Sequence, residues 1–477
     1  MNPVYLDNFN QGGLSDSKWS GKKYSQSKLV GFDPHLIPGL LKTAQKMTKY
    51  SGTTIDEFCK ETVASANGIN YWFSSTSGKI WQDKAGVITL VYTTSAAAGT
   101  HGCSGAFEYQ GYLYWATQSR LHRIPIDAGK ADGSSAWTTN AVPNWKTFSI
   151  TDTTFHPMVI QNQVLYIGDG NYLAQVDAGV FSANALDIVT PLRIKSLGKL
   201  GTDVLLGTYV ADTVTTTQII RWNTWSVSFT SSDDIPEIGI NAFLPMDNMV
   251  LASCGNAGRI YKYNGTILEL YKTIPGTYTP TATCTVHPSS VANLGGDVLF
   301  GVPNVSGNPC DELVYRFGRN SANYPYILDA PYPISERSGG AFVVSSIEIG
   351  GILVSGSNVY VAWKNGTTYG VDKLDYSNKL DGAYMETIVT VHTLDQNNLS
   401  DIAVLYSSLP ASTGVSIYTD INYAGYGSAL TTVTDTQRNV IRTKDIGTEF
   451  TTMQVKFVIT ASGNTAPDIQ SVALLLS

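Results

Sequence analysis

Short apolar runs that recur at regular intervals are the main pattern of this chain. Each unit consists of an apolar run, a turn of small residues and a second run that often contains Tyr, Trp or Arg. The apolar runs begin at positions 71, 112, 164, 204, 249, 298 and 359. Their mean spacing matches four-stranded β-propeller blades, which repeat about every 40–50 residues and stack on one another to bury both faces. We therefore predict a β-propeller of about seven blades, with the apolar run as the inner strand. Six blades, or an array of β-sandwiches, are the alternatives.

Residues 1–50 and 379–477 do not follow this repeat. The first segment is typical of an extended arm, in which 38–47 forms either a short helix or a strand that enters the first blade. Beyond 379, alternating apolar and polar positions predict strands at 388–393, 402–406, 453–459 and 469–475. Several short alternating strands in about 100 residues are typical of a β-sandwich. The expected organisation is an all-β chain with an arm (1–50), a β-propeller (51–378) and a C-terminal β-sandwich (379–477).

The composition supports an all-β protein with buried contact surfaces. Charged residues make up only 14% of the chain, and there are 27 Tyr and 44 Gly. Disorder and coiled coils need the opposite composition, with many charges and few aromatic residues. Because no run of about 18 apolar residues occurs, we expect no membrane span, and the first residues do not resemble a secretory signal.

The charge is distributed unevenly. The net charge is −7, yet the segment 1–50 carries seven Lys and three Asp, a net of +4, so the rest of the chain carries −11. We expect the basic arm to dock an acidic neighbouring protein, and we expect DNA to pass the acidic body without specific binding. The lysines expected to act in this docking are Lys22, Lys23, Lys28, Lys42, Lys46 and Lys49.

No pattern of residues predicts a metal site, a cofactor or catalysis. The five cysteines are widely spaced and are expected to be buried free thiols, and the six histidines have no ligand spacing. Asp169-Gly170-Asn171 fits a turn better than a calcium loop, because position 12 from Asp169 is Val180 rather than Glu. No nucleophile elbow or phosphate-binding loop occurs. We therefore predict a protein that is not an enzyme, with a propeller glycan hydrolase as the least supported alternative.

Exposed tyrosines are the remaining candidate contact residues. Tyr423 and Tyr426 lie in a small-residue loop between two predicted strands of the C-terminal part. Tyrosines in such a loop either stack on sugar rings or pack against a neighbouring subunit. A module that recognises a host-surface glycan is thus an alternative function.

Several short segments resemble virion proteins of tailed bacteriophages. They are 33–42 (DPHLIPGLLK), 167–171 (IGDGN), 332–340 (YPISERSGG) and 465–472 (TAPDIQSV). A Pro-Gly turn near the N-terminus, a propeller and a closing strand are similar to the tail nozzle, or hub, proteins of short-tailed phages, which have a similar length.

This resemblance implies a structural protein of the phage tail. It would be a nozzle, hub or tail-tip subunit that forms a homo-oligomeric ring, contacts other tail or adaptor proteins, and builds the wall of the tail channel. Its place would be the virion tail, where it would contribute to host attachment or genome ejection. The resemblance carries over no catalytic residue.

Overall fold

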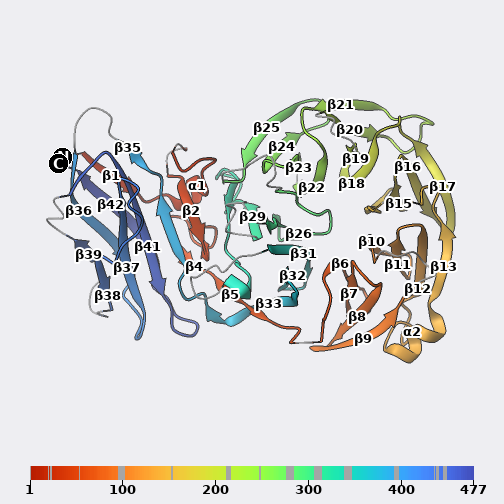
Figure 1. The fold of residues 1–477 in the computed structure, drawn as a ribbon, viewed down its shortest axis with the longest axis horizontal. Helices are drawn as coiled ribbons and strands as arrows, with labels where there is room; N and C mark the ends of the chain where they lie inside the picture. The colour runs from red at the N-terminus through yellow and green to blue at the C-terminus, as the bar shows by residue number, and fades with distance from the viewer. Residues whose placement is uncertain are drawn as a thin grey trace. The chain divides into compact units, whose positions relative to one another are not determined.

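The computed structural model forms two compact units, each built from more than one segment of the chain. It describes residues 2–19, 21, 24–52, 54–94, 102–151, 154–210, 216–246, 249–275, 284–305, 314–337, 346–391, 397–434, 436, 440–443 and 448–476. Unit 1 consists of Met1–Thr48, Asp311–Val343 and Leu374–Ser477, and unit 2 consists of Lys49–Cys310 and Val344–Lys373. Strands dominate both units (Figure 1), so the all-β prediction is confirmed.

Unit 2 contains five four-stranded antiparallel sheets, in each of which the strands follow one another in sequence order. The first two sheets are β6 (Cys59–Ala64), β7 (Asn70–Ser74), β8 (Lys79–Lys84), β9 (Val87–Thr93) and β10 (Gly105–Tyr109), β11 (Tyr112–Thr117), β12 (Arg120–Pro125), β13 (Val142–Thr147). The next two are β14 (Met158–Gln161), β15 (Val164–Asp169), β16 (Tyr172–Asp177), β17 (Val180–Asp187) and β18 (Arg193–Leu200), β19 (Asp203–Tyr209), β20 (Thr217–Trp222), β21 (Ser231–Ile235). The fifth is β22 (Ile240–Met246), β23 (Met249–Cys254), β24 (Arg259–Tyr263), β25 (Leu268–Thr273).

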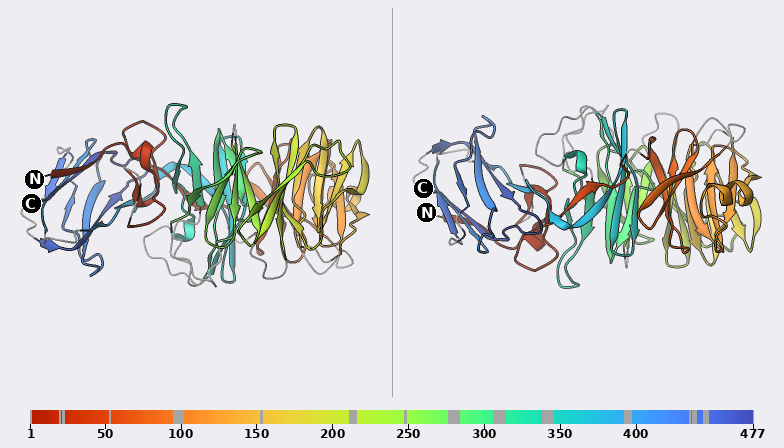
Figure 2. Two further views of the ribbon diagram at one scale, coloured as in Figure 1. Left: turned by 90° about the horizontal axis from the view of Figure 1, so that it is seen from above. Right: turned by 90° about the horizontal axis from the view of Figure 1, so that it is seen from below.

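Two further sets of strands complete unit 2. One is the antiparallel pair β26 (Val291–Leu294) and β27 (Asp297–Gly301). The other is β28 (Asn304–Val305), β31 (Ser346–Ser355), β32 (Asn358–Asn365) and β33 (Thr368–Lys379), which are neighbours in that order. A short helix, α2 (Ser134–Asn140), precedes β13. Figure 1 shows these sheets arranged around a common centre, and Figure 2 shows their strands running between the two faces of the unit.

The predicted strand pairs coincide with strands of the structure. The seven apolar runs lie in β7, β11, β15, β19, β23, β27 and β32. The second run of each sequence repeat lies in β8, β12, β16, β20, β24, β29 (Val314–Gly318) and β33. The expectation that the apolar run is the inner strand is wrong, because the strand before it, such as β6, β10 or β14, lines the centre. The apolar run is the second strand, and it is apolar because neighbouring strands and sheets cover it on every side.

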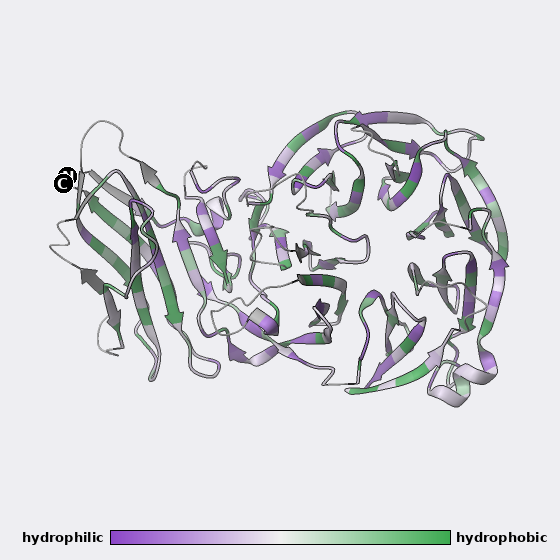
Figure 3. Ribbon diagram, viewed as in Figure 1, coloured by the Kyte–Doolittle hydropathy of each residue, from purple (hydrophilic) through white to green (hydrophobic). Residues whose placement is uncertain are grey.

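Apolar clusters lie between successive sheets of unit 2. One cluster joins the β6–β9 sheet to the β10–β13 sheet through Tyr71, Trp115 and Trp137. Others follow between each of the next three pairs of sheets. A further cluster joins β31–β33 to β6–β9 through Trp72, Trp81 and Tyr360, so the last sheet packs against the first. On the outermost strand β25 hydrophobic and hydrophilic residues alternate at Leu268, Glu269 and Leu270, whereas β21 is hydrophilic up to Ile235 (Figure 3).

Backbone contacts also join the last sheet of unit 2 to the segment that leads into the first. The N–H groups of Tyr50 and Ser51 donate to the Val371 carbonyl at 2.8 and 3.2 Å. Val371 N–H donates back to Ser51 Oγ at 3.0 Å. A Cβ atom on Gly350 would lie 2.1 Å from the Cys59 carbonyl oxygen, so β31 and β6 approach closely only because residue 350 has no side chain.

Unit 1 contains two larger antiparallel sheets. The first has the order β1 (Asn2–Leu6), β42 (Ile469–Leu476), β36 (Asn397–Tyr406), β39 (Val440–Thr443), and β40 (Thr448–Phe450) also pairs with β36. The second has the order β2 (Gln26–Val30), β34 (Tyr384–Thr387), β41 (Thr452–Thr460), β37 (Gly414–Ile421), β38 (Thr431–Val433), and β35 (Thr390–Val391) also pairs with β41. The expected strands at 402–406, 453–459 and 469–475 lie in β36, β41 and β42. The expected strand at 388–393 is reduced to β35, and residues 392 and 393 lie outside the described residues.

The N-terminal residues are strands of unit 1 rather than a free arm. β1 pairs with β42 from Asn2↔Leu476 to Leu6↔Val472, and β2 pairs with β34. Between them lies the short helix α1 (Phe9–Gly12). Of the two expectations for 38–47, the helix is wrong, since the segment contains β4 (Lys42–Thr43) and the start of β5 (Gln45–Lys49). The backbone is extended there, but β4 pairs with β3 (Phe32–Asp33) and does not enter the first blade as expected. A helix this short is barely stable alone, whereas Leu41 exchanges two backbone hydrogen bonds with Ile469.

A buried ion-pair cluster joins three short elements of unit 1, namely β3 (Phe32–Asp33), β29 and β30 (Ile327–Asp329). Arg316 Nη2 lies 2.6 Å from Asp33 Oδ1 and 2.5 Å from Asp329 Oδ2. His35 Nε2 lies 3.7 Å from Asp329 Oδ2. Burial raises the pKa of Asp33, but the charge and hydrogen bond of Arg316 outweigh it, so this pKa is lowered. A 3-10 turn (Ser335–Arg337) follows this region.

Candidate functional site

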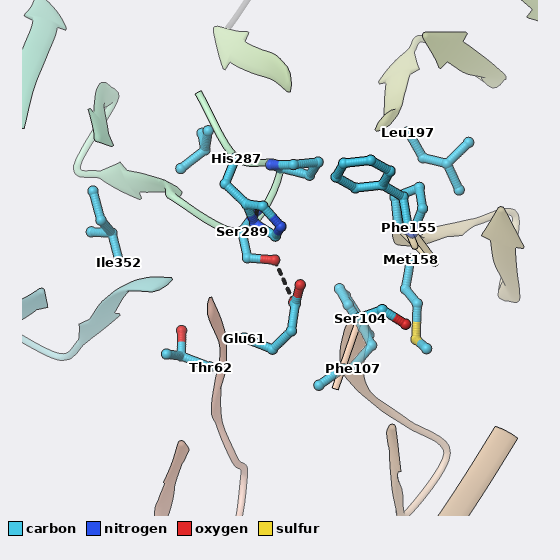
Figure 4. A pocket seen from close by; sticks show the side chains of 14 residues that line it. Glu61, Thr62, Ser104, Phe107, Phe155, Met158, Leu197, His287, Ser289 and Ile352 are labelled. Atoms are coloured by element: carbon cyan, nitrogen blue, oxygen red, sulfur yellow. Dashed lines mark hydrogen bonds between the residues drawn. The ribbon is translucent and has the colours of Figure 1, made fainter. Parts of the chain in front are cut away.

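A cavity of about 200 Å³ opens among the innermost strands of unit 2 (Figure 4). Its walls are formed by six strands and by three of the segments that lead into them. The strands are β6, β10, β14, β18, β26 and β31, and the segments precede β10, β14 and β26. The lining side chains are Glu61, Thr62, Ser104, Ala106, Phe107, Phe155, Pro157, Met158, Leu197, His287, Pro288, Ser289, Val291 and Ile352.

A second cavity of about 160 Å³ shares two of these residues, Phe155 and His287. It is lined by Lys60, Phe155, Lys195, Thr285, Val286, His287, Pro303, Glu348 and Ile349. The first cavity therefore presents the carboxyl group of Glu61, and the second presents two ammonium groups together with the carboxyl group of Glu348.

Glu61 is the buried acid of this site, since only 5% of its surface is exposed. Ser289 Oγ donates a hydrogen bond to Glu61 Oε2, which Figure 4 marks. Burial raises the pKa of Glu61 to about 7, although the Ser289 hydrogen bond and the Lys60 charge oppose the rise. Glu61 can thus hold or release a proton near neutral pH, as a general acid or base must.

Lys60 and Lys195 occupy equivalent places in the first strand of their sheets. In β6 the pairing with β7 skips Lys60, between Cys59↔Ser74 and Glu61↔Phe73. In β18 the pairing with β19 skips Lys195, between Ile194↔Thr208 and Ser196↔Gly207. A β-bulge leaves one residue unpaired and turns its side chain, which explains why these lysines line the cavity rather than the sheet ladder.

A third bulge supports Lys195. The pairing of β22 with β23 skips Asn241, between Ile240↔Cys254 and Ala242↔Ser253. Asn241 is 2% exposed, and its Oδ1 accepts a hydrogen bond from Lys195 Nζ at 2.7 Å. Burial lowers the pKa of Lys195 to about 8.

His287 stays neutral in this surrounding. Burial and the charges of Lys60 and Lys195 lower its pKa to about 3. Its Nδ1 accepts the Ser289 N–H at 3.3 Å, and its ring centre lies 6.0 Å from that of Phe155.

The arrangement offers binding groups rather than an assembled nucleophile. Ser289 Oγ donates to a carboxylate, while His287 Nδ1 accepts from a backbone N–H, so no Ser–His pair forms. Glu348 pairs with Lys364 at 2.8 Å. Among the described residues, no group of three or more His, Cys, Asp and Glu is placed to hold a metal ion.

The predicted docking lysines lie at separate places. Lys22 and Lys23 are outside the described residues, and Lys28 is partly buried in β2. Lys42 Nζ lies 3.4 Å from Asp468 Oδ2, Lys46 is partly buried, and exposed Lys49 lies with Nζ 5.0 Å from the Trp363 ring centre. No described contact joins these lysines into one patch.

The two predicted contact tyrosines have different surroundings. Tyr423 is 49% exposed, and its ring centre lies 5.3 Å from that of Trp19, which is also 49% exposed. Lys18 Nζ lies 5.1 Å from the Trp19 ring centre and 5.6 Å from that of Tyr423. Tyr426 is partly buried, and Lys456 Nζ lies 5.2 Å from its ring centre. Trp19 is thus a partner of Tyr423 that the sequence pattern did not reveal.

Other residues singled out in the sequence have structural surroundings. Cys59, Cys103, Cys254 and Cys284 are buried free thiols, as predicted, and Cys310 lies outside the described residues. Gly170 and Asn171 form the turn between β15 and β16, as predicted, and the Asp169 carboxylate accepts the N–H groups of Ser149 and Ile150. Burial lowers the pKa of His122 and of His156 to about 4.

Comparison with known proteins identifies no family. No protein-family model and no curated protein sequence matches this chain. Virginiamycin B lyase from Staphylococcus aureus is a similar solved structure at 13% identity and a TM-score of 0.42, covering 69% of this chain and 97% of that one. The Cps50 (Swd1) beta-propeller domain of Myceliophteria thermophila is similar at 10% identity and a TM-score of 0.44, covering 66% and 96%.

A third similar structure is the extracellular domain of a hybrid two component system, BT4673, from B. thetaiotaomicron. It is 13% identical with a TM-score of 0.48, and the match covers 77% of this chain but only 44% of that one. At these scores none of the three bears on what this chain does. In the part of the chain that the structure describes, no helix is long and apolar enough to cross a membrane.

Proposed function

We propose that unit 2 is a β-propeller with seven blades and that unit 1 is a β-sandwich. Support for the propeller comes from the meandering four-stranded sheets, the apolar clusters between successive sheets, and the cluster that joins the last sheet to the first. Support for the sandwich comes from the two antiparallel sheets of unit 1.

We propose that the chain is a structural subunit of a bacteriophage tail that assembles as a homo-oligomeric ring in the virion. The observation that carries this proposal is apolar exposure on the outermost strands of unit 2. Large apolar side chains there remain in water on four of the five complete sheets. They are Val87 (62% exposed) and Leu90 (45%) in β9, Val142 (39%) in β13, Val180 (70%) in β17 and Leu270 (53%) in β25.

Recurrent exposure of this kind is typical of a surface that a partner covers. Trp225 (83%) and Val227 (99%), just before β21, extend the same feature. The acidic charge of residues 51–477 suits a channel wall past which DNA slides, since like charges repel. The short segments that resemble tail nozzle proteins are the reason for proposing a phage tail protein.

Immunogold electron microscopy of particles from the producing culture tests this function. Antibody to the recombinant protein should label one end of the tail, and the position of the gold would distinguish a collar from a tip. Unlabelled particles, with intact antigen elsewhere, would refute the tail assignment.

Ring assembly has a separate test. Val180→Lys together with Leu270→Lys should reduce the oligomer mass measured by light scattering, because each change places a charge in the proposed contact. Leu430→Lys is the matched control, since Leu430 is 40% exposed but lies in unit 1. An unchanged oligomer mass, or a monomeric parent protein, would contradict the ring.

We propose further that lysines of the N-terminal segment 1–49 dock an acidic tail protein. Deleting 2–30 is a poor test, because it removes strands β1 and β2. The substitutions Lys22→Gln, Lys23→Gln and Lys49→Gln keep these strands and should lower incorporation into particles. Normal incorporation would show that these lysines do not dock a neighbour.

Glycan binding is the second candidate function, and the exposed pair of Trp19 and Tyr423 favours it. Aromatic rings in water offer stacking surfaces to sugars. Binding on a glycan array should be lost in Trp19→Ala and Tyr423→Ala but kept in Tyr5→Ala, which removes another exposed tyrosine of unit 1 (56% exposed). Equal binding by all variants would rule out this pair as the contact.

A further inference from the structure

The second cavity, which is lined by Lys60 and Lys195, combines two cations with little negative charge. Nζ of Lys195 has a neutral hydrogen-bond partner, Asn241, and lies 5.4 Å from the Phe155 ring centre. Nζ of Lys60 lies 5.6 Å from the Phe58 ring centre. Among the described residues, neither ammonium group has a carboxylate within ion-pair distance.

The nearby acids compensate this positive charge only in part. Glu348 lines the same cavity but is paired with Lys364. Glu61, in the adjoining cavity, accepts a hydrogen bond from Ser289 and is partly protonated near neutral pH. His287 adds no charge, because its pKa is far below neutrality. Two ammonium groups therefore face a confined space that keeps a net positive charge.

The bulges indicate that the lysines are directed into this space by the fold. Lys60 and Lys195 are each skipped by the pairing of an innermost strand, and Asn241, also skipped, fixes the position of Lys195 Nζ. Bulges beside a cavity commonly turn a side chain toward a ligand. Lys195 would cost less free energy on the surface, since burial of its ammonium group, which lowers its pKa, is unfavourable.

We propose that this cavity binds a small oxyanion, a phosphate or carboxylate group, between Lys60 and Lys195, with Thr285 as a further donor. A volume of about 160 Å³ is small for an organic cofactor but holds several water-sized groups, which suits an inorganic anion or the acidic group of a larger ligand. Charge-assisted hydrogen bonds from ammonium groups are the ordinary way in which proteins hold such groups. The proposal is independent of the tail assignment.

Isothermal titration of the full chain at constant ionic strength tests the site, with phosphate, sulfate and acetate as probes and chloride as the reference. We expect saturable binding of one anion per chain. Lys195→Met should weaken it at least tenfold. Lys199→Met is the matched control, because Lys199 lies in the same strand but is exposed, and it should bind like the parent.

The three probes distinguish the ligand class. Tight phosphate and sulfate binding would indicate a tetrahedral oxyanion, and tighter acetate binding would indicate a carboxylate. Absence of saturable binding of every probe to the parent protein would overturn the proposal, as would equal binding by Lys195→Met and the parent.

A second variant and a pH series cover the case in which Lys195→Met fails to fold. Lys60→Met should weaken binding independently. Sulfate keeps its charge between pH 6 and 9, so its affinity for the parent protein should fall as pH rises through about 8, where Lys195 loses its proton. Ionisation of Glu61 near pH 7 acts in the same direction. The Glu348–Lys364 ion pair also faces this cavity, and His287 stays neutral because its pKa lies far below this range. An affinity for sulfate that is constant from pH 6 to 9, together with unchanged binding by Lys60→Met, would refute the site.

Discussion

Arg316→Met is expected to destabilise unit 1 strongly, because it leaves two carboxylates buried without their cation. The side chains of Arg316, Asp33 and Asp329 are 4%, 7% and 0% exposed, and both acids lie within 2.6 Å of the guanidinium group. Removing one partner of a buried ion pair typically costs about 3–5 kcal/mol. Since about 1.4 kcal/mol corresponds to a factor of ten, amide exchange in this region should accelerate by roughly two to three and a half powers of ten.

The loss of stability in Arg316→Met should be larger at neutral pH than in acid. The pKa of Asp33 is lowered in the folded protein, so its contribution to stability is present above the unfolded-state pKa of about 3.9 and is lost as pH falls through the folded-state value. In Arg316→Met the Asp33 carboxylate no longer has its cation and can take up a proton in acid, which relieves the cost of its burial. The difference between parent and variant should therefore be larger at pH 7 than at pH 4.

Hydrogen exchange with mass spectrometry on peptides covering β3, β29 and β30 measures both effects. Arg319→Met is the matched control, because it removes a nearby arginine that contacts the Tyr326 ring (4.5 Å to its centre), a contact worth about 0.5–1 kcal/mol. An acceleration below tenfold in Arg316→Met, or one that is equal at pH 4 and pH 7, would refute the reasoning.

Two further predictions concern unit 2. Glu61 has a pKa of about 7 in the folded protein and about 4.5 otherwise, so its stabilising contribution is present below pH 4.5 and is lost as pH rises to 7, by about 3 kcal/mol. Urea unfolding at pH 5, 6, 7 and 8 should show this decline in the parent but not in Glu61→Gln; parallel curves would contradict it. Gly350→Ala should cost about 1–3 kcal/mol, because its Cβ would meet the Cys59 carbonyl oxygen, whereas Gly427→Ala enters open space and should leave the melting temperature unchanged. Equal melting temperatures for both variants would count against the close approach of β31 and β6.

The repeat was predictable because the second strand of each sheet is covered on all sides. Val204–Leu206 in β19 illustrates this, since all three residues are 0% exposed and form an unbroken apolar run. The innermost strands carry no comparable signal. In β6 buried and partly buried residues alternate: Cys59, Glu61 and Val63 are buried, and Lys60 and Thr62 are partly buried. Because one of the buried residues, Glu61, is charged, the sequence does not show this alternation as apolar and polar positions.

The cavity residues could not be assembled from the sequence because they come from separate repeats. Lys60 and Lys195 belong to the first and fourth repeats, and no short motif contains both. The bulges that turn them depend on strand pairing, which a sequence does not display. One signal was present, namely a polar residue eight to eleven positions before the apolar run, at Lys60, Lys195 and Asn241.

The pairing of β1 with β42 has a consequence for synthesis of the chain. Asn2 and Leu476 are neighbours in one sheet, yet they lie at opposite ends of a chain of 477 residues. At about 5–20 residues per second, a ribosome needs roughly half a minute to a minute and a half to deliver the partner of the first strand. During that interval the backbone groups of β1 and β2 await strands that do not yet exist, although the early sheets of unit 2 are already complete. A chaperone that shields the segment from β1 to β2 should therefore raise the yield of correctly folded protein more than one that acts on unit 2.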